Sequence, residues 1–271
     1  MLHKLTEYFK SAGVNIVQLG AFNAVACYQD LPKLDFVLFL DKDAAFAKFL
    51  EKQGIKVYNS GQTIEICDDK QKTYSELASL DINFIPTVFA PLMYDCVEKI
   101  DNEFLEFAVD KLGFPLIAKP NISSGGMGVH LIKDYTELVD SYYKLKKTQF
   151  SFQKYIETQG SDIRCYVVGK KVIAAVKRQN ENNFISNTLF GGKITEYKAN
   201  KKLINFAEKI AKNLSLDYGS VDFLQDGNKY YFLEANSNAY FKSAEEIGIE
   251  ISKPLIDYIV KQENERKHTK N

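Results

Sequence analysis

The sequence predicts a protein of mixed α/β and α+β class, with a small parallel unit followed by two α+β units. Three observations lead to this fold class. Strand-like and helix-like segments alternate over residues 1–67, as they do around a parallel sheet. Residues 68–150 combine helical periodicity with apolar strands. Residues 151–262 hold several strand-like segments separated by tight turns, which favours an antiparallel sheet, and a polar tail follows at 263–271.

In the first unit, residues 2–11 predict an amphipathic helix and residues 14–19 alternate as a strand. The apolar run 35–40 is typical of a strand covered on both faces, and a helix at 44–53 and a strand at 55–58 follow it. In the second unit we expect helices at 68–79, 98–112 and 135–145 and an extended stretch at 85–88, and a strand at 150–156 crosses into the third unit.

In the third unit, strands at 162–168 and 171–178 meet at a hairpin turn, and a helix covers 201–214. A strand that carries Asp222 and a strand at 230–235 flank the turn at Asp226 and Gly227. The residues from 261 to 271 are polar, and we expect them to be frayed.

The composition excludes several classes of function. The chain has 271 residues, of which 35 are basic and 35 acidic. A net charge of zero provides no basic field, so we expect no nucleic-acid partner. No apolar run approaches the ~20 residues of a membrane span and no signal peptide is evident, so we expect a cytoplasmic protein without membrane contact. The scattered cysteines favour reduced thiols over a zinc site, and no Ser–His or Cys–His arrangement suggests nucleophilic hydrolysis.

Residues 114–129, FPLIAKPNISSGGMGV, combine a strand, a lysine and a glycine-rich turn. Glycines at 125, 126 and 128 tolerate backbone conformations in which N–H groups converge on a phosphate. Lys119 adds a cation on a flexible stem, but it precedes the glycines, so the stretch is not a Walker loop. Taken alone, the stretch also fits a plain hairpin with a solvated lysine.

A second group of polar residues lies near the Asp226-Gly227 turn. The predicted hairpin could bring Asp222 close to Glu234, and Asn236 shares a strand face with Glu234. Two carboxylates and an amide oxygen suit Mg²⁺, whereas the alternative is solvated acids at a strand edge. On the preceding strands Arg164 and Arg178 could bind a carboxylate or a phosphoryl group, with surface ion pairs as the alternative.

In their order along the chain these motifs resemble the ATP-grasp superfamily, and most closely the RimK-like carboxylate–amine ligases, the α-L-glutamate ligase group. The resemblance covers roughly residues 35–260 and implies an ATP-grasp fold, in which the two α+β units clamp ATP. It is carried by these stretches: CDDKQKTY, FPLIAKPNISSGGMGV, FQKYIE, SDIRCYVVGKKVIAAVKR, NFISN with the following GG, LDYGSVDFL and YFLEANSNAYF.

The resemblance also implies roles for individual residues. It assigns the phosphates of ATP to Lys119, Ser123, Ser124, Gly126, Gly128, Ser186 and Asn187. It also places Lys70 among the ATP-binding residues, as a lysine before the first helix of the ATP-grasp fold. It assigns the adenine hinge and the ribose to Gln153, Lys154, Tyr155, Ile156 and Asp162. Two Mg²⁺ ions, with Mn²⁺ as a substitute, are expected on Asp222, Glu234 and Asn236. The catalytic residues are expected to be Lys119, Arg164 and Arg178.

The implied reaction is an ADP-forming ligation. A carboxylate attacks the γ-phosphate, and an amine then attacks the acyl-phosphate to give an amide. We expect a small-molecule carboxylate and an amine or peptide acceptor, with glutamate or another amino acid added to a peptide, protein or small metabolite. Two alternatives stay open, an ATP-binding module without ligase activity and an ATP-grasp phosphotransferase. We expect Lys119→Ala and Asp222→Asn each to abolish ATP turnover without unfolding the chain.

The chain departs from the family pattern at several points. Lys154 replaces an acidic hinge residue, and Ile185 replaces the arginine before Ser-Asn. Residues 237–241, SNAYF, stand where the family often has a turn such as SPG. The chain also starts at a helix where the family starts with a strand. We therefore expect a shortened first unit with a sheet edge that a homo-oligomer could cover.

Overall fold

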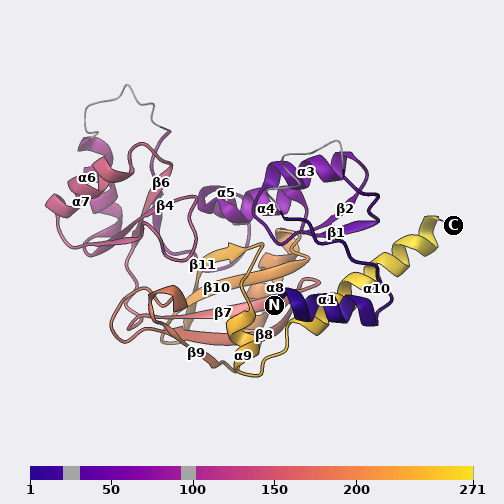
Figure 1. Cartoon of the computed structure of the whole chain (residues 1–271). Coiled ribbons are helices and arrows are strands. Elements are labelled where there is room, and N and C mark those ends of the chain that lie inside the picture. Colours follow the sequence, from indigo (N-terminus) through magenta and orange to yellow (C-terminus); the bar gives the residue numbers. More distant parts are fainter. Residues whose placement is uncertain (21–30, 93–101, 271) are drawn as a thin grey trace.

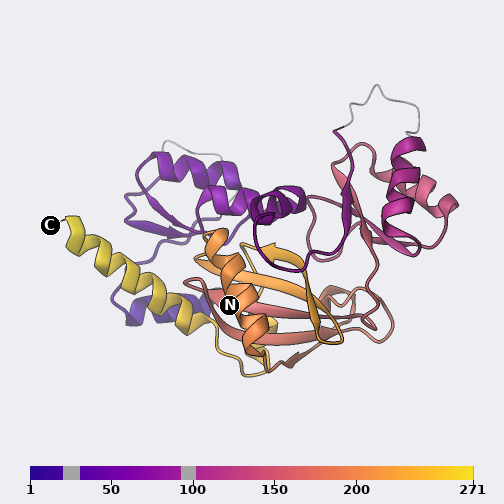
Figure 2. The same cartoon turned by 180° about the vertical axis from the view of Figure 1, so that it is seen from behind.

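Within the described residues, three β-sheets, each backed by helices, follow one another along the chain (Figures 1 and 2). The structure, a computed structural model, describes residues 1–20, 31–92 and 102–270. The predicted mixture of a parallel unit and antiparallel sheets with helices is confirmed. None of the helices in these ranges is both long enough and apolar enough to cross a lipid bilayer. The division of the chain at residues 67, 150 and 262 stays a prediction.

The first sheet is the predicted parallel pair. Strands β1 (Phe36–Leu38) and β2 (Lys56–Tyr58) place Val37 opposite Val57, and α3 (Ala44–Lys52) connects them. The predicted strand at 14–19 is wrong, since residues 14–20 have no strand partner among the described residues. Val14 and Ile16 instead pack against the apolar cluster around helix α1 (Leu2–Ser11). Their alternation reflects one-sided packing rather than a sheet.

The helix predicted at 68–79 corresponds to α5 (Lys70–Leu77), and a helix that was not predicted, α4 (Gly61–Asp68), ends directly before it. Asp69 separates them because its backbone is extended and its side chain accepts hydrogen bonds from the N–H groups of Gln71 and Lys72. Ser60 caps α4 in the same manner by accepting from the N–H of Thr63. The break at Asp69 places Lys70 at the first position of α5, where its side chain turns towards the second sheet.

The second sheet has four antiparallel strands in the order β3-β6-β4-β5. They are β3 (Thr87–Phe89), β4 (Leu116–Pro120), β5 (His130–Ile132) and β6 (Phe150–Lys154). Helices α6 (Asn102–Leu112) and α7 (Tyr135–Leu145) cover this sheet, with Phe150 and Phe152 buried beneath them (Figure 1). The predicted start of α6 at residue 98 lies outside the described residues.

The third sheet has five antiparallel strands in the order β11-β10-β7-β8-β9. They are β7 (Ser161–Val168), β8 (Lys171–Gln179), β9 (Lys193–Glu196), β10 (Tyr218–Asp226) and β11 (Lys229–Asn236). The predicted helix at 201–214 is α8 (Lys201–Asn213), whose residues Leu203, Ala207 and Ile210 are buried. Strand β9, the short turn η1 (Thr188–Phe190) and helix α9 (Lys242–Glu246) were not predicted.

The predicted frayed tail is wrong, because helix α10 runs from Ser252 to Lys270. Glu263 is buried and accepts a hydrogen bond of 2.8 Å from the hydroxyl of Tyr58 on β2. Arg266 pairs with Glu263 and donates to the backbone oxygen of Asp35 at 2.6 Å. These contacts hold α10 against the first sheet. Helix α10 also packs against α1 (Figure 1).

Candidate active site

An open cleft with an empty volume of about 850 Å³ takes its walls from the second and third sheets. Most residues to which the sequence assigns a role line it, namely Lys70, Lys119, Ser123, Ser124, Gly126, Gln153, Lys154, Tyr155, Ile156, Asp162, Arg178, Ser186, Asn187 and Glu234. Four do not line it, namely Gly128, Arg164, Asp222 and Asn236. Side chains from segments that are distant in sequence therefore meet in this cleft.

Lys119 on β4 is only 4% exposed, and its Nζ donates to Oε1 of Gln153 at 2.8 Å. The amide nitrogen of Gln153 donates to Tyr74 and Thr87, which turns the amide oxygen towards the lysine. No carboxylate lies within 4.0 Å of Lys119 in the described part of the chain. Burial, with a smaller effect of the Lys70 charge, lowers the pKa of Lys119 to about 7. A buried amine without a counter-charge is a strong site for an anion.

Lys70 is the second cation of the cleft and is also nearly buried, at 9% exposed. Its Nζ donates to the backbone oxygen of Ser123 at 3.2 Å and to the Ser123 hydroxyl at 3.1 Å. Across residues 1–20, 31–92 and 102–270 it has no carboxylate partner either. Lys70 therefore ties the start of α5 to the glycine-rich loop and leaves its positive charge available to a ligand.

The glycine-rich loop needs its glycines for two reasons. Gly125, Gly126 and Gly128 have φ values of 70°, 85° and 73°, which side chains of L-residues rarely adopt. A Cβ atom on Gly126 would also lie 2.8 Å from Cγ2 of Ile185, and one on Gly125 would lie 2.9 Å from Cδ1 of Leu189. The loop thus packs closely against residues 185–190, which come from the third sheet.

A network of buried charges lies on β7, β8 and β10. Arg178 donates to Asp162 at 2.7 and 2.5 Å and to Asp222 at 2.9 Å. Arg164 donates to both carboxylate oxygens of Asp222, the shortest contact being 2.6 Å. The register explains the network, because Asp222 faces Arg164 on the neighbouring strand and Asp162 faces Arg178. Burial alone would raise the pKa of Asp222, but the two arginines lower it.

Asp222 does not fit the predicted role of metal ligand in this geometry. Its carboxylate is fully buried, and the arginines and the Ser220 hydroxyl occupy both of its oxygens. Glu234 does fit, because it faces the cleft and forms no ion pair with any described residue. Oδ1 of Asn236 likewise accepts no hydrogen bond from the described chain, since only its amide nitrogen is engaged. Among the described residues no three His, Cys, Asp or Glu side chains gather to hold a metal.

The segment predicted to be the hinge lies at the end of β6. The backbone N–H of Lys154 donates to Pro86, whereas those of Tyr155 and Ile156 bond to no described residue. The ring of Tyr155 lies edge-on to Phe184, and apolar residues line the cleft nearby. The side chain of Lys154, where the chain departs from the family pattern, is exposed. Two free N–H groups beside an apolar wall suit a flat, polar-edged ring.

Three residues that hold the side chains of the site were not predicted from the sequence, namely Ser220, Tyr74 and Thr87. Ser220 could have been found, because it precedes Asp222 by two positions on the same strand and therefore faces the same side. Tyr74 and Thr87, which orient Gln153, come from a helix and a strand far away in sequence. No local pattern indicates that these side chains meet.

Comparisons with known proteins agree with this geometry. Residues 67–259 match the family model described as a RimK-like ATP-grasp domain. The chain is 34% identical over 246 residues to an uncharacterized protein of Mycoplasma pneumoniae, which covers 86% of this chain and 85% of that protein. It is 31% identical over 222 residues to the glutamate–LysW ligase ArgX of Sulfurisphaera tokodaii, which covers 78% and 74%.

Among solved structures, the chain resembles a D-alanine–D-alanine ligase from Bacillus anthracis complexed with ATP, with a TM-score of 0.73. The superposition covers 99% of this chain and 92% of that chain at 22% identity, so it shows the fold alone. The matched family model spans most of the chain and includes the residues of the cleft. The chain therefore belongs to the RimK-like ATP-grasp family, with the ATP-grasp fold and the activity of an ATP-dependent carboxylate–amine ligase.

Proposed function

We propose that the cleft binds ATP with its phosphates against Lys70 and Lys119, and that the enzyme adds glutamate or another amino acid to a peptide, protein or small metabolite. The observation that carries this proposal is the pair of nearly buried lysines, neither of which has a carboxylate partner in the described part of the chain. Burying an unpaired charge is costly, so a site of this kind is stabilised when an anion arrives. The N–H groups of Ser124 and the following glycines would close over the phosphates.

The adenine ring would lie at the hinge. The unpaired N–H groups of Tyr155 and Ile156 offer hydrogen bonds to its edge, and the apolar wall near Phe184 contacts its faces. Asp162 is taken by Arg178 and Ser186, so we assign it to holding Arg178 rather than to the ribose. Ser186 and Asn187 stay in the proposed phosphate-side loop, where both line the cleft.

Glu234 and Asn236 would hold Mg²⁺, which neutralises phosphate charge when bound. Asp222 instead acts on the arginines, because it fixes the planes of both guanidinium groups. Arg178 lines the cleft and can donate to a reacting oxygen, whereas Arg164 does not line it and serves to position Asp222. A second ion on the same side chains, and Mn²⁺ in place of Mg²⁺, stay predictions of the resemblance.

The proposed reaction has two steps. A substrate carboxylate oxygen bonds to the γ-phosphorus of ATP, the bond to the bridging oxygen breaks, and ADP leaves. An amine nitrogen then bonds to the acyl carbon, and phosphate leaves as the amide forms. The N–H groups of Arg178 would stabilise the negative oxygen of the tetrahedral intermediate. The chain supplies no nucleophile, which agrees with the absence of a catalytic triad in the sequence.

The substrate assignment draws on a relative. The ligase from Sulfurisphaera tokodaii is named for glutamate and for LysW, and it shares 31% identity with this chain. An amino acid and a peptide or protein acceptor are therefore the first substrates to test. A cytoplasmic location, homo-oligomer formation and the lack of a nucleic-acid partner are further parts of the proposal.

The test is phosphate release from Mg-ATP in the presence of each of the twenty amino acids, with and without peptide acceptors. Mass spectrometry of each positive reaction should show a product lighter by one water than its two parts. A phosphorylated product without amide would favour the phosphotransferase alternative. ATP binding without turnover for any amino acid or acceptor would favour a binding module and would contradict the proposal.

A further inference from the structure

The segment between β8 and β9, residues 180–192, contributes to the wall of the cleft although it contains no strand. Its four consecutive residues 184–187 line the cleft. The Ser186 hydroxyl donates to Asp162 at 2.6 Å, whereas the backbone N–H groups of Ser186 and Asn187 donate to no described residue. Two free N–H groups on neighbouring residues suit the oxygens of a phosphate. What this wall can bind therefore depends on what holds its backbone in place.

Asn180, the residue directly after β8, binds this segment at two points. Asn180 is buried, at 6% exposed. Its Nδ2 donates to the backbone oxygen of Phe190 at 2.7 Å and to that of Ile185 at 3.3 Å. Its Oδ1 accepts from the N–H of Asn182 at 3.0 Å. One buried amide thus ties together the two ends of the stretch that carries the free N–H groups.

Asn180 is itself fixed to the third sheet. Its backbone N–H donates to the oxygen of Gly160 at 2.9 Å, and Gly160 directly precedes β7. A Cβ atom on Gly160 would lie 2.3 Å from the oxygen of Asn180 and 2.2 Å from that of Asn183, so only glycine fits this contact. The position of Asn180 therefore follows from the packing of the third sheet.

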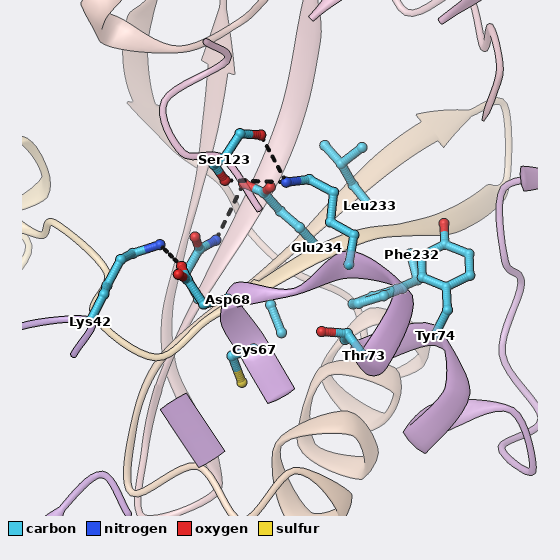
Figure 3. A pocket seen from close by; sticks show the side chains of 12 residues that line it. Lys42, Cys67, Asp68, Thr73, Tyr74, Ser123, Phe232, Leu233 and Glu234 are labelled. Carbon is cyan, nitrogen blue, oxygen red and sulfur yellow. Dashed lines mark hydrogen bonds and ion pairs between the residues drawn. The ribbon is translucent and has the colours of Figure 1, made fainter. Parts of the chain in front are cut away.

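The opposite wall of the proposed phosphate site is anchored separately. There Lys70 donates to the Ser123 hydroxyl at 3.1 Å, and Ser123 lines a small pocket together with Glu234 (Figure 3). Where the two walls meet, the side chain of Ile185 packs closely against Gly126. Apolar contacts are not directional. The orientation of the backbone at residues 185–190 therefore depends on the hydrogen bonds of Asn180.

We infer that Asn180 is a positioning residue for the nucleotide, which holds the backbone so that the N–H groups of Ser186 and Asn187 meet the phosphates. A displaced segment would present these donors at the wrong distance and angle, and hydrogen bonds weaken steeply when their geometry is lost. The loss should therefore increase with the number of phosphates and spare the base, which we place at the hinge. The inference rests on the proposed function, because that function places the phosphates beside Ser186 and Asn187.

The test compares Asn180→Ala with Asn200→Ala. Asn200 is a matched control, because its Oδ1 also accepts from a backbone N–H, that of Leu203, and its Nδ2 donates to the Tyr230 hydroxyl, and neither partner lines the cleft. The probes are AMP, ADP and the non-hydrolysable ATP analogue AMPPNP, each titrated calorimetrically with Mg²⁺ into the full-length wild type and both variants. The second readout is the KM for ATP in the phosphate-release assay.

We expect Asn180→Ala to raise the dissociation constant of AMPPNP and the KM for ATP at least tenfold, because misplaced contacts are costly, and that of AMP less than twofold. ADP should show an intermediate loss, and Asn200→Ala should stay within twofold of the wild type for every nucleotide. Equal weakening of all three nucleotides by Asn180→Ala would show a purely structural role and would overturn the inference, as would three unchanged dissociation constants or the same selective loss in Asn200→Ala. A wild type that binds AMP as tightly as AMPPNP would instead contradict the proposed phosphate site, and with it the proposed function.

Discussion

Replacing Lys119 with methionine should make the protein more stable while it removes the anion site. The lysine has a pKa of about 7 in the folded chain against 10.5 for an exposed lysine. This difference corresponds to about 5 kcal/mol of destabilisation at neutral pH. Loss of the bond to Gln153 costs about 1–3 kcal/mol. We therefore expect Lys119→Met to raise the free energy of unfolding by about 2–4 kcal/mol at pH 7.

The pH dependence identifies the cause. Between pH 7 and 10.5 the unfolded chain carries a proton on Lys119 that the folded chain lacks, so the wild type gains stability as the pH rises. Methionine does not titrate, so the advantage of the variant should be largest at pH 7 and below and should vanish towards pH 10.5. Equilibrium urea unfolding followed by circular dichroism measures it.

The matched control is Lys171→Met, because this lysine is 73% exposed in a surface ion pair with Glu208. We expect its effect to stay within about 0.5 kcal/mol at every pH. A Lys119→Met variant that is less stable than the wild type at pH 7, or whose advantage does not change with pH, would refute the reasoning.

Three further predictions follow from the site. Mg-ADP at a hundred times its dissociation constant should stabilise the wild type by about 2.7 kcal/mol in urea unfolding and leave Lys119→Met almost unchanged. Asp222→Asn should lower the free energy of unfolding by about 3–5 kcal/mol, because two buried arginines lose a shared counter-charge; stability equal to the wild type would contradict the network. Gly126→Ala should raise the KM for ATP at least tenfold, because φ is 85° and the new Cβ meets Ile185; an unchanged KM would argue against a role of the loop in binding phosphates.

The sheets were predictable where local chemistry decides the structure. The turn at Asp226 and Gly227 and the apolar run at 35–40 each determine a strand and its neighbour, and the structure confirms both pairs. The predictions of secondary structure were wrong where tertiary contacts determine the conformation of a segment. The strand at 14–19 has no described partner, and the polar end of α10 is helical because Glu263 and Arg266 anchor it to the first sheet.

The site was predictable as a set of positions but not as a set of contacts. The order of the motifs indicated which segments line the cleft, and most of the named residues do line it. The role of Asp222 depends on the strand order β10-β7-β8, which places arginines from two neighbouring strands around one carboxylate. No local sequence pattern predicts the order of the strands in a sheet. The structure therefore changes the expectation that Asp222→Asn leaves the fold intact.

The measurement that tests the central claim most directly is the pKa of Lys119 with and without nucleotide. Lysine labelled with ¹³C at the ε position gives one NMR signal per side chain, and Lys119→Met assigns the signal. We predict a pKa of about 7 in the free enzyme and a value raised towards or above the ordinary 10.5 once Mg-ADP is bound, because the phosphates supply the missing counter-charge. An ordinary pKa in the free enzyme, or a low pKa that nucleotide does not raise, would contradict the account.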